Sequence, residues 1–387
     1  MIPHYRAIKI TAIIHKNAHH KVWSGLKYAG VYNIHHEPGR YPVLGVKKGF
    51  LSSLLNSDPI IDNPMSIFSI IVFPDIENEV MEIVRKNADL QIPGHGSVYS
   101  EDIIVYHENS LYFATDSIQA DKPKEKFFKG LTGIFCILPR GFGEPVSKIL
   151  LENGIGVPTV TYGSGTGLRD KLGLLKITLP REKDILKLIV NSSDAGHVMN
   201  FMIEAGQLES PGRGFIYEYP VKHGLINTRV SLDGSRHTAN IDQIIAALDR
   251  LHGNVEWRKR SSNNSYSNSN RNFFSGVDVH FYCNEGFILE IVKKLRKLGV
   301  SGSTMKTLKL MSKSDDTDDI DHEPRIKISP AREACNMLVP EKNLPEILEE
   351  MEKIGAFGSE IQGMLYTTHI PRAFTYQSKR KFNSNLH

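Results

Sequence analysis

Apolar residues follow two alternating periods along this chain. Strand-like apolar runs cover residues 7–14, 66–73, 130–138, 185–190, 277–283 and 331–339. Segments with apolar residues at helical spacing follow them, at 19–28, 76–87, 144–152, 194–205, 287–298 and 344–354. This alternation of strands and amphipathic helices predicts an α+β fold.

A glycine turn entering a strand occurs more than once. The segment PGHGSVY at 93–99 recurs as PGRGFIY at 211–217, and IQGMLY at 361–366 is a degraded copy that keeps Gly363 and Tyr366. Together with the strand and helix order, this predicts three tandem ferredoxin-like (βαββαβ) domains. A lone domain of this kind leaves one sheet face uncovered, so the three are expected to pack as an intramolecular pseudo-trimer.

The predicted domain boundaries follow from these copies. The first domain covers 1–122, the second 123–225, and the third 272–387 with a basic tail. Residues 226–271 are predicted to be an extension, with a helix at 240–251 and a Ser/Asn-rich linker that cannot bury a core. Long loops at 35–65, 163–184 and 311–329 are the expected interaction elements.

Composition narrows the function classes. The 387 residues carry a net charge of +4, which is too small to indicate nucleic acid as the main partner. The apolar runs are shorter than the roughly 20 residues of a membrane span, and the N-terminus lacks a secretory pattern, so a cytoplasmic location is expected. The odd number of cysteines, without CxxC spacing, predicts buried thiols.

Glycine-rich segments are the candidates for binding an anion, because glycines let backbone amides converge on it. A structural turn and a flexible surface loop are the alternative interpretations. Arginine and lysine in these segments, together with Arg140 beside a predicted helix start, would neutralise phosphate charge. The candidate residues are Gly94, Gly96, Arg140, Gly163, Ser164, Gly165, Thr166, Gly167, Arg169, Lys171, Gly206, Gly212, Arg213 and Gly214.

Histidines suggest a different class of site. His15 and His19 have helical spacing, and His35 and His36 lie in the same predicted domain, so a metal site built from these four is the alternative hypothesis. The sequence has no nucleophile elbow, no HExxH and no Cys/His pair at a telling spacing, so catalytic activity is not predicted.

The segment 133–141 (GIFCILPRG), the loop GSGTGLRDKLGLL at 163–175 and PGRGFIYEYPV at 211–221 resemble PII-like signalling proteins of the nitrogen regulatory protein P-II superfamily. The resemblance implies a regulatory protein that binds an adenine nucleotide (ATP, ADP or AMP) or a similar anion in clefts between domains. It also implies signalling through long T-loops to a protein target such as a transporter or an enzyme. A CutA-like metal-binding protein and a structural assembly module with degenerate sites are the alternatives.

Overall fold

A computed structural model of the chain describes residues 4–45, 59–107, 118, 127–165, 182–231, 271–300, 303–312 and 331–376. The strands are β1 (Tyr5–His15), β2 (Ile34–Leu44), β3 (Ile60–Val72), β4 (Gly96–His107), β5 (Leu131–Pro139), β6 (Thr159–Gly165), β7 (Glu182–Asn191), β8 (Phe215–Val221), β9 (His223–Leu225), β10 (Phe274–Asn284), β11 (Thr304–Met311), β12 (Arg332–Val339) and β13 (Met364–Thr375). The α-helices of the described residues are α1 (His19–Tyr28), α2 (Glu77–Asn87), α3 (Gly143–Glu152), α4 (Ala195–Ala205), α7 (Ile288–Leu295) and α8 (Leu344–Lys353).

These strands form one continuous antiparallel sheet that closes on itself. The order β11-β12-β10-β13-β8-β5-β7-β6-β2-β3-β1-β4-β9 is completed by pairings of β11 with β2 and β6, and of β13 with β4. In β11, Leu310 lies opposite His35 of β2, while Thr304 lies opposite Gly165 of β6. Closure satisfies the backbone groups that open edges would leave unpaired, and it produces a β-barrel.

The predicted fold class is therefore wrong. Strands dominate the structure, and it is a closed antiparallel barrel rather than three tandem ferredoxin-like domains. The same finding overturns the description as a tandem repeat of PII-like domains packed as a pseudo-trimer. The physical reason for closure is strand length. The strands β2, β3, β4 and β13 are 11 to 13 residues long. Because of this length, β2, β4 and β13 also pair with strands from distant parts of the chain.

Part of a predicted loop is also sheet. The prediction of a loop at 35–65 is wrong for its described residues, because β2 and β3 pair continuously from His35 opposite Ser69 to Leu44 opposite Ile60. Pro38 and Pro42 lie within β2, although proline donates no ladder hydrogen bond. The remaining predicted loop residues 46–58, 166–181 and 313–329 lie outside the described residues, as do the predicted helix at 240–251 and most of the linker.

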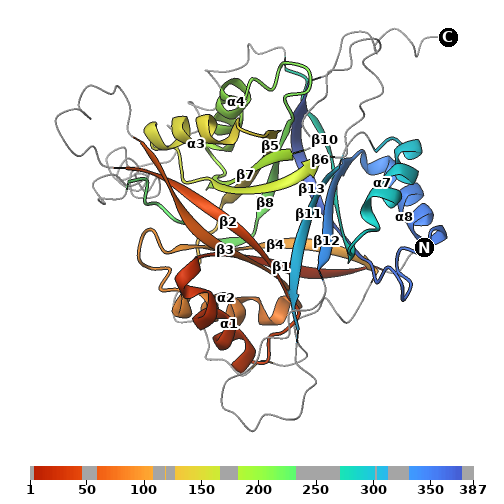
Figure 1. The fold of residues 1–387 in the computed structure, drawn as a ribbon, viewed down its shortest axis with the longest axis horizontal. Helices are drawn as coiled ribbons and strands as arrows, with labels where there is room; N and C mark the ends of the chain where they lie inside the picture. Colours follow the sequence, from red (N-terminus) through yellow and green to blue (C-terminus); the bar gives the residue numbers. More distant parts are fainter. Residues whose placement is uncertain are drawn as a thin grey trace, which may run out of the picture.

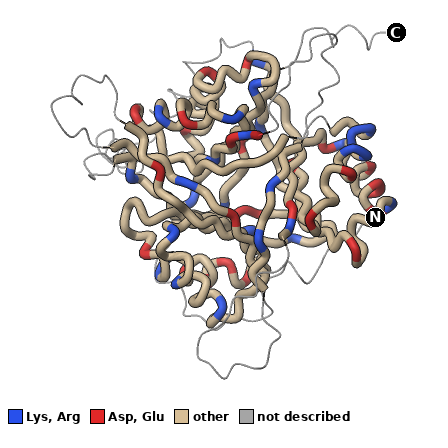
Figure 2. The backbone as a smooth tube through the Cα atoms, viewed as in Figure 1, with Lys and Arg blue, Asp and Glu red and all other residues tan. Residues whose placement is uncertain are grey.

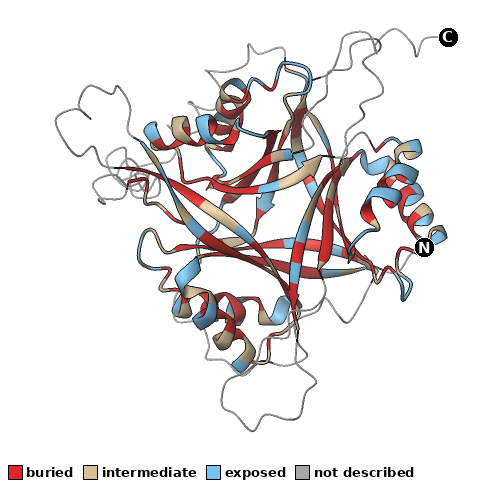
Figure 3. Cartoon of the chain, viewed as in Figure 1, coloured by how far each residue is buried: buried red, intermediate tan, exposed pale blue. Residues whose placement is uncertain are grey.

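The helices lie in three pairs on the outside of the closed sheet (Figure 1). Each pair covers an apolar core; under α1 and α2 this core includes Val22, Leu26, Val80 and Val84. The inner face of the sheet is buried as well, with Tyr41, Tyr99, Phe135 and Tyr217 in one cluster (Figure 3). Because both faces are covered, strands read as nearly continuous apolar runs in the sequence.

Two smaller expectations concern the described residues. Cys136, Cys283 and Cys335 are free and buried, as predicted. Among the residues described, no helix has the length and apolar character needed to cross a membrane.

Candidate functional site

The first glycine turn is filled by the chain itself. The amide of Gly94 donates a 2.8 Å hydrogen bond to Oδ1 of Asn227, and the amide of Asn227 donates to Oγ of Ser97, also at 2.8 Å. The side chain of Arg229 packs against Gly94, where a Cβ would lie 2.8 Å from its Cδ. A side-chain oxygen from the segment 226–231 thus occupies the place beside this turn where a ligand oxygen would bind.

The second glycine turn is open. Gly212 has a φ of +75° and is exposed, and its amide has no hydrogen-bond acceptor among the described residues. The Arg213 guanidinium carbon lies 4.3 Å from the centroid of the Phe142 ring, so the cation is held on an aromatic face. Gly206 ends helix α4, and its amide donates to the Met202 carbonyl, so it belongs to the helix cap.

The last glycine of each turn has a structural role that explains its presence. A Cβ at Gly96 would lie 2.0 Å from the Ile13 carbonyl oxygen, and a Cβ at Gly214 would lie 1.8 Å from that of Ile137. Their φ angles of +142° and +117° are also unfavourable for other residues. For these two positions the structural-turn interpretation is therefore sufficient.

Arg140 lies between the ring of Tyr162 and the carboxylate of Asp184. Its guanidinium carbon is 3.8 Å from the centroid of Tyr162, and its Nε is 3.7 Å from Oδ1 of Asp184. The other oxygen of Asp184 accepts hydrogen bonds from the amides of Gly141 (2.8 Å) and Gly143 (3.0 Å). The carboxylate thus satisfies the start of α3, which removes the need for an external anion at that helix terminus.

The loop candidates divide between sheet and undescribed residues. Gly163, Ser164 and Gly165 belong to β6, where Gly163 pairs with Lys183 and Ser164 with Glu182. Thr166, Gly167, Arg169 and Lys171 lie outside the described residues. The segment Arg140–Gly143 thus contains one candidate arginine, and its Phe142 contacts the other, Arg213. Gly94 and Gly96 lie in a separate turn, which Asn227 fills.

The four histidines of the metal hypothesis do not converge. The rings of His19 and His36 are neighbours, 4.8 Å between centroids, but His35 lies on the other face of β2, stacked on Tyr282 at 4.5 Å. Nδ1 of His15 accepts a hydrogen bond from the Asn17 amide. Within the described part of the chain, no group of three or more His, Cys, Asp and Glu residues has a geometry that could hold a metal ion.

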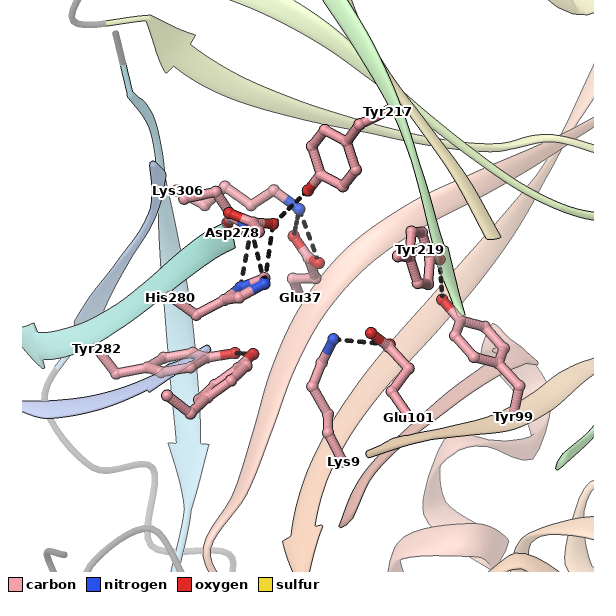
Figure 4. A network of polar contacts seen from close by, with 12 residues as sticks. Lys9, Glu37, Tyr99, Glu101, Tyr217, Tyr219, Asp278, His280, Tyr282 and Lys306 are labelled. Atoms are coloured by element: carbon pink, nitrogen blue, oxygen red, sulfur yellow. Dashed lines mark hydrogen bonds and ion pairs between the residues drawn. The ribbon is translucent and has the colours of Figure 1, made fainter. Parts of the chain in front are cut away.

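Sequence reasoning missed the most polar part of the interior, the barrel centre. Figure 4 shows acidic and basic side chains of this region pointing toward one another from neighbouring strands. Lys9 pairs with Glu101 at 2.9 Å, and Lys306 pairs with both oxygens of Glu37 at 3.0 Å. Charged residues on the strands inside the ring of helices are visible in Figure 2 as well.

Asp278 is the third carboxylate of the barrel centre. It accepts from Nε2 of His280 at 3.0 Å, from Nδ2 of Asn336 at 3.1 Å, and from the hydroxyl of Tyr217. Burial alone would raise the pKa of Asp278, but the charge and hydrogen bond of His280, with the other donors, lower it overall. The pKa of Glu37 is lowered in the same way, because Lys306 outweighs burial.

These groups enclose a cavity of about 40 Å³. A buried water needs about 10–15 Å³ by this measure, so the space suits a few waters or one very small solute and excludes a nucleotide. The one signal in the sequence was polar residues inside apolar strands, such as Lys9 in AIKITAII and Asp278 in GVDVHFYC. Neither the protein-family models nor the curated proteins compared with the chain give a match.

Proposed function

We propose that this chain is a cytoplasmic, non-catalytic regulatory protein that binds an anionic small molecule at its second glycine turn, residues 210–214. The observation that carries the proposal is the contrast between two turns of the same sequence pattern. The Gly94 amide is satisfied by an oxygen of Asn227, whereas the corresponding Gly212 amide has no acceptor among the described residues.

The surroundings of the second turn favour a negative ligand. Arg213 and Arg140 are both held on aromatic rings, those of Phe142 and Tyr162, which reduces the conformational entropy lost when a guanidinium binds an oxyanion. A glycine-rich turn that presents amides beside arginines suits a phosphate group. An adenine nucleotide is the ligand class that we propose first.

The route to a partner starts at Tyr162. This residue lies in β6, directly before Gly163, and its exposed ring carries Arg140. A ligand that draws Arg140 toward its phosphate would release this ring at the strand leading to residues 166–181. We propose that this change alters binding of a protein target, such as a transporter or an enzyme.

The test is calorimetric titration of the full chain with ATP, ADP, AMP and inorganic phosphate. Loss of one charged hydrogen-bond donor costs roughly 1.5–3 kcal/mol, so Arg213→Ala should weaken binding by about tenfold or more. Arg6→Ala, at an exposed arginine on β1, is the matched control and should bind as the wild type does. Two results would leave only the structural role of the turn. In one, the wild-type protein binds none of the four compounds; in the other, the Arg213→Ala variant binds them as tightly as the wild type does.

A further inference from the structure

The ring of Tyr162 carries two guanidinium groups that come from distant parts of the chain. The guanidinium carbon of Arg140, between β5 and α3, lies 3.8 Å from the ring centroid, and that of Arg40, on β2, lies 5.4 Å from it. Two cations at one ring repel each other, so each limits how closely the other approaches. The ring is 44% exposed, so a guanidinium can leave it or close on it without disturbing an apolar core.

Arg40 has a donor left for a further contact. Its Nη1 forms an ion pair with Oδ2 of Asp62, on the adjoining strand β3. Its Nε is buried and has no hydrogen-bond acceptor among the residues that the structure describes. Burial alone would lower the pKa of Arg40, but the hydrogen bond and charge of Asp62 raise it overall, with further contributions from Tyr162 and Asp184. The charge of Arg40 therefore acts on both groups that hold Arg140.

Asp184 needs a new cation when Arg140 turns away. Its Oδ1 is buried, accepts no hydrogen bond from a described residue, and lies 3.7 Å from Nε of Arg140. The amides of Gly141 and Gly143 donate to the other oxygen, Oδ2. Removing the partner of a buried charge is costly unless another cation replaces it. Arg40 can supply that cation, because its charge already acts on Asp184.

The strand register places Arg40 on the same side of the sheet as Tyr162. Arg40 lies opposite Val160 of β6, and residues two apart on a strand point to the same face, so Tyr162 lies on the face that Arg40 shares. Arg40 also lies opposite Pro64 of β3, so its backbone is held between two strands. The Arg40 side chain can therefore close on the ring without any change of strand pairing.

We propose that Arg40 is a positioning residue for the ligand of the second glycine turn. When a bound phosphate draws Arg140 away, Arg40 closes on the Tyr162 ring and faces Asp184 in its place. This inference rests on the proposed function. It adds a link from the ligand to β2 and β3, the strands that precede and follow residues 46–58.

The test is a double-mutant cycle, read by calorimetric titration of the full chain with ATP. Arg40→Gln should weaken ATP binding by about two- to fivefold, which is the effect of one exposed cation–π contact. In an Arg140→Gln background the same substitution should leave the affinity unchanged, because no arginine then has to be replaced at the ring. Arg6→Gln, at an exposed arginine of β1, is the matched control and should change the affinity in neither background.

The outcomes separate this inference from the proposed function. Wild-type protein that binds no ATP would overturn the adenine-nucleotide proposal and this inference with it. Wild-type protein that binds ATP as tightly as Arg40→Gln does would overturn the inference alone. Equal weakening in both backgrounds would also overturn it, because Arg40 would then act through the fold and not through Arg140.

A second measurement does not depend on the Arg140→Gln variant binding tightly enough to titrate. In wild-type protein labelled with ¹⁵N at arginine, ATP should shift the Nε resonance of Arg40 as the guanidinium closes on the Tyr162 ring. The resonance is assigned by its absence from Arg40→Gln. A resonance that stays in place while ATP binds would overturn the inference.

Discussion

Burial of His35 where the barrel closes should make the protein less stable at acid pH. Its side chain is only 2% exposed and stacks on Tyr282, in the region where β2 joins β11. Burial lowers the pKa of His35 from 6.5 to about 3, and the nearby positive charge of Arg332 contributes to this shift. The folded protein therefore keeps this imidazole neutral at a pH where the unfolded chain protonates it.

The direction of the pH effect on stability follows from the number of protons bound by the folded and unfolded states. Between pH 6.5 and about 3 the unfolded state binds more protons at this position, so the free energy of unfolding falls as pH falls. At pH 5 the two pKa values correspond to a loss of about 2 kcal/mol relative to neutral pH. Replacing His35 with glutamine removes this proton-linked term, although lost packing lowers stability at every pH.

The assay is urea unfolding of wild type and His35→Gln at pH 7.5 and pH 5. The difference in unfolding free energy between the two pH values should be about 2 kcal/mol smaller in His35→Gln. His20→Gln, which removes an imidazole from the exposed side of α1, provides the matched control. An unchanged pH dependence in His35→Gln would refute the buried, neutral state of this side chain.

Three further predictions concern other positions. Lys9→Met alone should lower the free energy of unfolding by about 3–5 kcal/mol, since it leaves Glu101 charged and unpaired; adding Glu101→Gln should recover part of the loss in the same urea assay. Gly96→Ala should lower the melting temperature, because its Cβ would overlap a carbonyl oxygen of the neighbouring strand; unchanged melting would count against the turn geometry. Asn227→Ala should free the Gly94 amide and add a weak second phosphate site in calorimetry, and unchanged stoichiometry would argue against the comparison of the two turns.

Individual helices and strands could be predicted from the sequence, because the spacing of apolar residues that marks them spans only a few neighbouring positions. The helix expected at 76–87 is α2, Glu77–Asn87, and the strand expected at 277–283 lies within β10, Phe274–Asn284. Closure could not be predicted in this way, because it depends on pairings such as β11 with β2, between residues about 270 positions apart. Such edge pairings use backbone groups that every residue carries, so they leave little trace in side-chain periodicity.

The candidate site, too, could be predicted only where its signal is local in the sequence. The glycines were visible as a motif, but the sequence could not show that Asn227 fills one turn and leaves the other open, because that contact spans 133 residues. The barrel centre was hidden for another reason. Single charged residues such as Lys9 and Asp278 within apolar strands resemble the polar positions of an ordinary exposed face until their partners are known.

The most direct measurement of the central claim is an NMR titration of protein labelled with ¹⁵N at glycine. If the second turn binds an anion, ATP or phosphate should shift the amide resonance of Gly212, while that of Gly94, already bonded to Asn227, stays in place. Shifts of equal size at both glycines, or at neither, would contradict the account.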